Sequence, residues 1–182
     1  PMDRVLVWDV WFWKTEIAFN AIFHAFLNKK QSILISPLVV LAYQHYNKAL
    51  ERFANFWLKI EILTRYETPE ASKRVLDKLK SWEIDLVIWT HRLLWDKVIY
   101  KNLWLLIVDE EHKFWVLQKE KIKKISTSID ILSMSATPIP RSLNMALSWI
   151  RDISILSTPP DVRKWVETFV SNYSRSEERR VG

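Results

Sequence analysis

Short apolar runs alternate along the chain with longer segments whose apolar residues recur at helical spacing. The apolar runs show no regular polar alternation, so each predicts a strand that is buried on both faces. Strands of this kind are typical of a parallel sheet covered by helices. The predicted strands are 4–7, 32–36, 59–63, 85–89, 105–108, 130–134 and 167–170.

The amphipathic segments predict helices at 14–27, 39–53, 69–79, 117–125 and 141–147. Repeated alternation of strand and helix predicts an α/β fold, a doubly wound parallel sheet with helices on both faces. The stretch 157–161, STPPD, interrupts the alternation and is the predicted domain boundary.

Length and composition limit the class of protein. The 182 residues suffice for one domain with a core, and 49% hydrophobic against 26% charged residues excludes a disordered chain. The net charge of +6 is compatible with a polyanionic partner but does not require one. The lack of cysteine excludes disulfides and thiolate metal sites. The sequence has no signal peptide and no membrane-length apolar run, which predicts a soluble, cytoplasmic protein with no membrane partner.

Glycine and tryptophan occur in abnormal numbers. Roughly 13 glycines are expected at the usual frequency of about 7%. The chain has one, Gly182, whereas tryptophan occurs 11 times. A fold with tight turns and no glycine is physically awkward, because glycine enters positive φ far more readily than other residues.

The stretch 8–16, WDVWFWKTE, lies between a predicted strand and a predicted helix. This is the frame of a phosphate-binding P-loop, G-x-x-x-x-G-K-[ST], but Trp8 and Trp13 stand where the motif has glycine. A lysine at this helix N-terminus can reach the β- and γ-phosphates, and a threonine hydroxyl can bind Mg²⁺. Taken alone, Lys14 and Thr15 fit an ordinary helix turn with an exposed lysine better.

Carboxylates follow the buried strand 105–108 in the stretch LLIVDEEH. Asp109 and Glu110 stand at its carboxyl end, where α/β sheets bind ligands. An aspartate there can bind Mg²⁺, and a glutamate can orient or deprotonate a water molecule. A solvated acidic turn is an equally good interpretation of this stretch alone.

Two polar loops follow other predicted strands. In SMSATPIPR, 133–141, hydroxyl residues and two prolines form a rigid loop, for which a plain strand-to-helix turn is the alternative. In IWTHRLL, 88–94, Thr90 and Arg92 suit contact with a nucleic-acid backbone, although a surface loop is the simpler interpretation. His24 and His45 fall on predicted helices and are expected to be packing or surface residues.

The order of the lysine-threonine loop, DEEH and SATPIPR, each after a predicted strand, resembles motifs I, II and III of superfamily 2 helicases and translocases. The stretches PMDR, KTE, QHY, RFANF, THRLL, IVDEEHKF, SATPIPRSLNMALS, IRD and TPP are similar to the bacterial transcription-repair coupling factor family. Branch-migration helicases share the SATPIPR-type and DE-H elements but fit RFANF and the TPP region less well. The resemblance covers nearly the whole chain, from residue 1 to about residue 173.

The resemblance implies a RecA-like P-loop NTPase lobe, the first motor lobe of an ATP-dependent double-stranded DNA translocase that uses ATP and Mg²⁺. Such proteins displace stalled RNA polymerase and recruit excision-repair proteins, here through domains outside this sequence. The lobe is expected at 1–158, truncated at its N-terminus, followed by a linker and the start of a second lobe at 159–174. This fragment alone is expected to be inactive, because the family's arginine finger lies on the second lobe. The tail 175–182 departs from the family and resembles a translated sequencing adapter.

The family's functional positions fall on particular residues of this chain. The nucleotide-binding positions are Trp8, Asp9, Val10, Trp11, Phe12, Trp13, Lys14, Thr15 and Glu16. The catalytic positions are Lys14, Asp109 and Glu110, and the Mg²⁺ positions are Thr15 and Asp109. The positions that couple hydrolysis to lobe movement are His112, Ser135, Ala136 and Thr137. The DNA-binding positions are Pro37, Arg65, Thr90 and Arg92. Leu38 and Val39 replace two threonines that the family often has, which removes two hydroxyls from a phosphate contact.

The resemblance also concerns the tryptophans. The family has glycine at eight of the eleven positions: Trp8, Trp11, Trp13, Trp82, Trp89, Trp104, Trp115 and Trp149. We hypothesise that most or all of the tryptophans are glycines encoded by UGA, which another translation table reads as tryptophan. If they are real tryptophans, a non-catalytic α/β module is expected, because no indole fits a loop that encloses phosphate. A third interpretation, another P-loop enzyme such as a small-molecule kinase, is opposed by DEEH and SATPIPR.

Overall fold

The computed structural model describes residues 1–8, 12–90, 102–110, 128–135 and 152–156. Helices and strands alternate in the first half of the chain, as the hydrophobic pattern predicts. The strands are β1 (Asp3–Trp8), β2 (Gln31–Ser36), β3 (Ile60–Leu63), β4 (Leu86–Thr90), β5 (Leu103–Asp109), β6 (Asp130–Ser135) and β7 (Asp152–Leu156). The helices are α1 (Phe12–Leu27), α2 (Val39–Arg52) and α3 (Pro69–Ser81).

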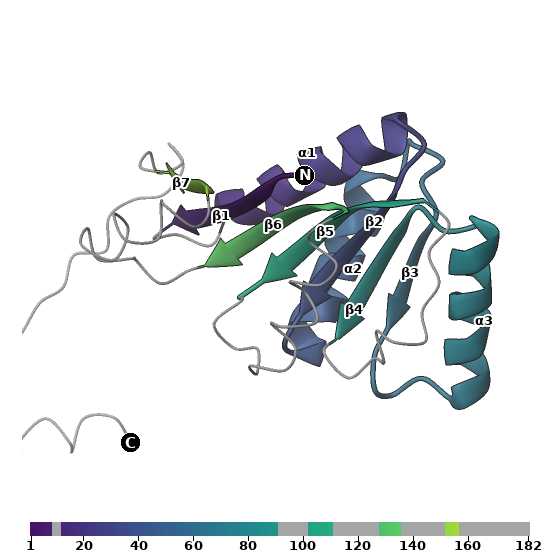
Figure 1. Ribbon diagram of the computed structural model, residues 1–182. Helices are drawn as coiled ribbons and strands as arrows, with labels where there is room; N and C mark the ends of the chain where they lie inside the picture. The colour runs from purple at the N-terminus through teal and green to yellow at the C-terminus, as the bar shows by residue number, and fades with distance from the viewer. Residues whose placement is uncertain (9–11, 91–101, 111–127, 136–151, 157–182) are drawn as a thin grey trace, which may run out of the picture.

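The seven strands form one sheet in the order β3-β4-β2-β5-β6-β1-β7, and every neighbouring pair is parallel (Figure 1). The strand order reverses direction along the chain, as in a doubly wound fold. Because all the strands run the same way, their carboxyl ends meet at one edge of the sheet. Residues that follow different strands are therefore brought together at that edge.

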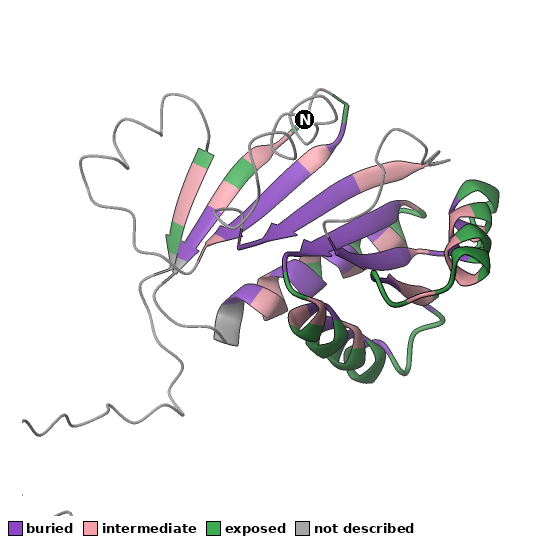
Figure 2. Ribbon diagram, turned by 90° about the horizontal axis from the view of Figure 1, so that it is seen from below, coloured by how far each residue is buried: buried purple, intermediate pink, exposed green. Residues whose placement is uncertain are grey.

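Helices cover both faces of the sheet, each over its own hydrophobic core. One core joins α1 and α2 to the sheet through residues such as Phe19 and Leu34. The other joins α3 to the opposite face through residues such as Leu79 and Ile33. Successive residues of β2 belong to opposite cores, and all of β2 is buried. Figure 2 shows that buried residues lie along the middle of the sheet, whereas the helices also carry exposed residues. The predicted doubly wound fold with helices on both faces is confirmed.

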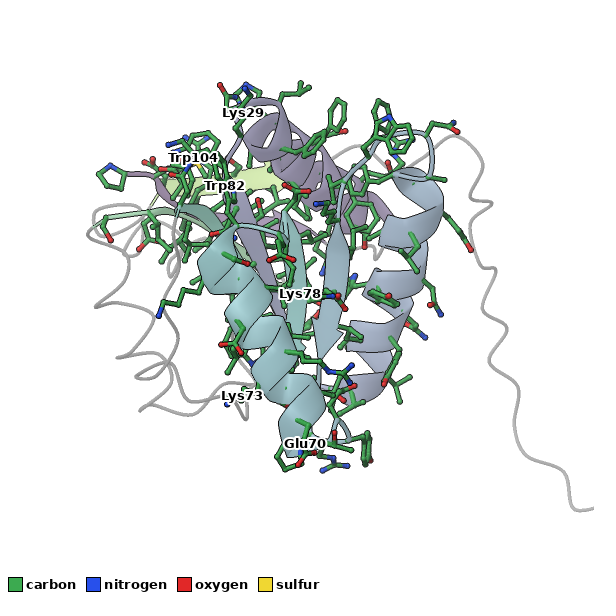
Figure 3. The ribbon with its side chains drawn as sticks, turned by 90° about the vertical axis from the view of Figure 1, so that its right-hand side faces the viewer. Lys29, Glu70, Lys73, Lys78, Trp82 and Trp104 are labelled. Atoms are coloured by element: carbon green, nitrogen blue, oxygen red, sulfur yellow. The ribbon has the colours of Figure 1, made fainter. Side chains whose placement is uncertain are left out.

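Local signals set the ends of α3. The Thr68 hydroxyl accepts a hydrogen bond from the backbone N–H of Ala71, and proline occupies the first helical position. Trp82 follows the last residue of α3, at the opposite end of the helix from Glu70 (Figure 3). Its φ of 69° and ψ of 31° are a left-handed conformation. Its N–H donates to the Leu79 carbonyl, and the next N–H donates to the Lys78 carbonyl. This pair of bonds is a Schellman cap, at whose left-handed position glycine is strongly preferred.

The first six predicted strands and the first three predicted helices are confirmed, with their ends displaced by at most two residues. The strand β7 was not predicted. It pairs with β1 at the outer edge of the sheet, where Asp152 and Ile155 are exposed, so it lacks the continuous apolar run of a central strand. The predicted elements at 117–125, 141–147 and 167–170 and the boundary at 157–161 lie outside the described residues. Within the described part of the chain, no helix is both long and apolar enough to cross a bilayer.

Candidate functional site

Three of the predicted motifs stand at the carboxyl ends of neighbouring strands. The strand β6 lies between β1, which precedes Lys14, and β5, which ends at Asp109. In register, Ser135 pairs with Val7 of β1, and Met134 pairs with Asp109. One stretch of the carboxyl edge therefore holds Lys14 and Thr15, the acidic pair Asp109 and Glu110, and Ser135, the first residue of SATPIPR.

Lys14 is in the first turn of α1 and is almost completely buried. Its Nζ lies 3.7 Å from Oε1 of Glu110, and the two side chains are 5% and 6% exposed. The alternative of an exposed lysine in an ordinary helix turn is wrong. A buried ammonium group requires a compensating negative charge. Glu110 supplies that charge in this structure.

Glu110 has an unusual backbone conformation at the point where the chain leaves β5. Its φ is 53°, and its N–H donates to the Met134 carbonyl of β6 at 2.9 Å. A left-handed conformation costs a non-glycine residue about 1–2 kcal/mol. Such conformations persist where surrounding structure enforces them, and they cluster at functional sites. Asp109 and Glu110 are both buried, so the alternative of a solvated acidic turn is wrong.

Sequence reasoning missed the contact between His45 and Asp109. His45 is buried, as expected of a packing residue, but its Nε2 also lies 2.8 Å from Oδ2 of Asp109. A signal was present in the pattern of α2, where Ala42, His45 and Ala49 form the buried stripe. A histidine among alanines on a buried face requires a polar partner. His24, by contrast, is exposed on α1, as expected.

The donor atoms at this edge fit phosphate and a hard divalent cation. Lys14 at the start of a 16-residue helix suits an anionic ligand, because helix N-termini present free N–H groups and a positive dipole. The carboxylate of Asp109 and the hydroxyl of Thr15 are oxygen ligands of the kind that Mg²⁺ prefers. Thr15 also lines an open cavity between α1 and α2, together with Phe19, Lys48 and Arg52.

The residues expected to contact DNA follow a different group of strands at the same edge. Pro37 follows β2, Thr90 ends β4 in register with Ser36, and Arg65 lies just beyond β3. These strands form the β3-β4-β2 side of the sheet, beside the β5-β6-β1 side. Pro37 and Thr90 are buried, whereas Arg65 is exposed.

Arg65 is held by an aromatic neighbour. Its guanidinium lies 4.9 Å from the ring centroid of Tyr66, and its Nη2 donates to the Tyr66 hydroxyl at 2.7 Å. Nearby, α2 begins at Val39 with no side-chain hydrogen bond from its N-cap residue, Leu38. A threonine at that position could supply such a bond.

Several expected site residues lie at the ends of the described segments or outside them. Trp8 ends β1, and Phe12 and Trp13 begin α1, with only their backbones described. The residues that lie outside the described part of the chain are Asp9, Val10, Trp11, Arg92, His112, Ala136 and Thr137. Glu16 is described and forms an ion pair with Arg52 at 3.2 Å.

Comparisons with known proteins agree with this geometry. Residues 13–146 match the family model described as DEAD/DEAH box helicase. The chain is 49% identical to the transcription-repair-coupling factor of Borreliella burgdorferi and 47% identical to that of Escherichia coli, over 95% and 94% of its length. It spans 15% of the length of each of these two relatives.

A solved structure provides a similar fold. The structure of RecG bound to a three-way DNA junction superposes with a TM-score of 0.74 at 37% sequence identity. The match covers 90% of this chain and 22% of the RecG chain. The same arrangement of strands and helices is therefore found in a protein whose structure was determined with DNA.

Proposed function

The chain belongs to the DEAD/DEAH box helicase family, and from this premise we propose that it is the first motor lobe of an ATP-driven double-stranded DNA translocase. The observation that carries the proposal is the buried pair of Lys14 and Glu110 beside Asp109, at the edge where β1, β6 and β5 end. Burying ionised side chains is costly unless opposite charges or hydrogen bonds compensate them, and clusters of buried ionisable side chains often mark functional sites. The family implies that this ligand is a nucleotide.

Each side chain has a distinct role in the proposed reaction. Lys14 binds the β- and γ-phosphates of ATP, and Thr15 and Asp109 hold Mg²⁺. The metal ion, when bound, neutralises charge on the phosphate oxygens. Glu110 orients the attacking water molecule and accepts its proton. Ser135, Ala136, Thr137 and His112 respond to hydrolysis and move the lobes.

We further propose that the whole protein is a transcription-repair coupling factor, which displaces stalled RNA polymerase and brings excision-repair proteins to damaged DNA. Support comes from bacterial proteins of that name at 49% and 47% identity, which exceed the 37% identity to RecG. The polymerase and repair partners would bind domains beyond this chain. The proposed domain limits remain 1–158 for the lobe, 159–174 for the linker and the start of a second lobe, and 175–182 for a non-native tail.

The proposed DNA contacts lie on the β3-β4-β2 side of the carboxyl edge. Arg65 is exposed there, and its guanidinium is ordered against Tyr66. Pro37 and Thr90 are buried at the carboxyl ends of β2 and β4, so their proposed part in binding is to shape the backbone that faces DNA. Contacts of this kind give affinity that depends on salt and not on base sequence.

We also propose that the tryptophans at the family's glycine positions are glycines in the natural protein. Support comes from Trp82, which adopts the left-handed conformation of a Schellman cap. The structure gives no such support for glycine at position 89, because Trp89 has no positive φ and is packed, 2% exposed, in the core between the sheet and α3. Peptide mass spectrometry of the protein from its native cells decides the matter at each position. Tryptophan at positions 8, 11 and 13 would instead favour the non-catalytic α/β module.

The proposed function is tested by ATP hydrolysis with the full-length gene product, made with its native genetic code. We expect magnesium-dependent hydrolysis that increases when double-stranded DNA is added. Absence of nucleotide binding would favour the non-catalytic module. Hydrolysis that transfers phosphate to a small molecule and ignores DNA would favour another P-loop enzyme.

A further inference from the structure

The contact between α2 and the end of β5 is a buried hydrogen bond between His45 and Asp109, residues that lie 64 positions apart. His45 is 8% exposed and Asp109 is also 8% exposed. An ionised carboxylate can only accept hydrogen bonds, so the N–H at Nε2 of the imidazole is the donor. Hydrogen bonds to an ionised group are shorter and stronger than neutral ones, and the 2.8 Å distance fits that class.

The position of Asp109 explains why its side chain needs such a partner. It is the last residue of β5, and Glu110 leaves the strand in a left-handed conformation. The carboxylate can rotate about the bond that joins it to Cβ, and this torsion angle has a broad distribution in aspartate side chains. The hydrogen bond engages Oδ2 and fixes that rotation. The other carboxylate oxygen then has a defined direction for a metal ion or a metal-bound water molecule.

We propose that His45 is a positioning residue that holds the Asp109 carboxylate in the orientation required to bind Mg²⁺. The inference rests on the proposed nucleotide site and adds to it a residue from outside the three motifs. His45 acts through Asp109, in the way that hydrogen-bond partners of metal-ligating carboxylates do. Loss of such a partner typically weakens metal affinity by about 10–100-fold.

The test compares variants of the full-length protein that differ in hydrogen-bonding capacity. His45→Leu keeps apolar volume but removes the donor, and His45→Gln retains a donor. His24→Leu is the matched control, because His24 is exposed on α1 and its ring contacts Trp104 and Asn28. Two quantities are measured: the Mg²⁺ concentration that gives half-maximal ATP hydrolysis, and the rise in melting temperature that ADP causes with Mg²⁺ relative to ADP with EDTA.

We expect His45→Leu to raise the half-activating Mg²⁺ concentration by at least about tenfold and to reduce the magnesium-dependent part of the stabilisation by ADP. His45→Gln should recover most of both quantities, and His24→Leu should match the unsubstituted protein. A histidine with only a packing role would leave the Mg²⁺ dependence unchanged. If His45→Leu does not fold, His45→Met, whose flexible side chain adapts to irregular space, carries the same comparison.

The outcomes separate this inference from the proposed function. If the unsubstituted protein shows no magnesium-dependent stabilisation by ADP, the proposed nucleotide site is wrong. If the unsubstituted protein responds and the His45→Leu or His45→Met protein has the same half-activating Mg²⁺ concentration, the nucleotide site stands and the role of His45 is overturned.

Discussion

The ammonium group of Lys14 and the carboxylate of Glu110 lie 3.7 Å apart, each almost completely shielded from water. The two residues come from different motifs and are joined only by the fold. Each compensates the charge of the other, so removing either side chain takes away an opposite charge that faces a buried ionised group. An arriving phosphate would offer Lys14 a second anionic partner and would free Glu110 to act on water.

The first prediction concerns this pair. Lys14→Met and Glu110→Gln should each lower the free energy of unfolding by about 3–5 kcal/mol, because each removes the opposite charge that faces the remaining buried charge. The double variant should lose less stability than the sum of the two single losses, because neither of the two buried charges then remains. Urea denaturation of the three variants measures this difference.

The partly exposed ion pair of Lys78 and Glu61 is the matched control. Its atoms lie 2.7 Å apart, and the side chains are 45% and 31% exposed. Ion pairs in contact with solvent typically contribute about 0–1 kcal/mol. Equal losses for the buried pair and this partly exposed pair would contradict the interpretation of Lys14 and Glu110.

The second prediction concerns the end of α3. Trp82→Gly should raise the free energy of unfolding by about 1 kcal/mol, because the left-handed conformation penalises a side chain bearing Cβ and suits glycine. Trp57→Gly is the control, since Trp57 is 95% exposed and its φ is not positive. That control should give no comparable gain. A Trp82→Gly variant less stable than the parent would mean that indole packing outweighs backbone strain.

The third prediction concerns DNA binding by Arg65. Arg65→Ala in the full-length protein should weaken binding of duplex DNA uniformly across sequences and reduce the dependence of log K on log salt by about one unit. Lys73→Ala, on the outer face of α3 (Figure 3), should change neither quantity. Titrations at several salt concentrations measure both. An unchanged salt slope would remove Arg65 from the DNA-binding surface.

The fourth prediction is a pH dependence of stability at Tyr43. Partial burial of the side chain, followed by the nearby carboxylate of Glu67, raises the pKa of Tyr43 above its ordinary value of 10.0, and the hydroxyl donates to that carboxylate at 3.2 Å. The phenol therefore keeps its proton in the folded state at a pH where the unfolded chain loses it. The resulting stability is present below pH 10 and is lost as pH rises through the higher folded-state pKa. Tyr43→Phe should lack this loss above pH 10, and identical pH profiles would contradict the assignment.

The central strands were predictable because their signal is local. In β2, for example, consecutive apolar residues serve both cores, so the sequence itself shows burial on two faces. The strand β7 was missed because its edge position leaves Asp152 and Ile155 exposed. Its pairing with β1 is a long-range contact that no local pattern encodes.

The site was predictable in part for the same reason. The closeness of Lys14, Asp109 and Glu110 could be expected, because they stand at or just after strand ends whose order along the chain is recognisable. The burial of Lys14 and the contact of His45 with Asp109 were not found, because both depend on which strands become neighbours. The position of a histidine in a helical sequence does not indicate which strand the histidine will contact.

The most direct test of the account is ATP hydrolysis by the full-length protein with Glu110→Gln, in the presence of Mg²⁺ and duplex DNA. Glutamine keeps the shape of the side chain but is a poor proton acceptor. We expect ATP still to bind and the maximal rate to fall by about 10²-fold or more, in line with loss of a general base. Hydrolysis at the rate of the unsubstituted protein would contradict the assignment of this buried pair as the nucleotide-hydrolysing site.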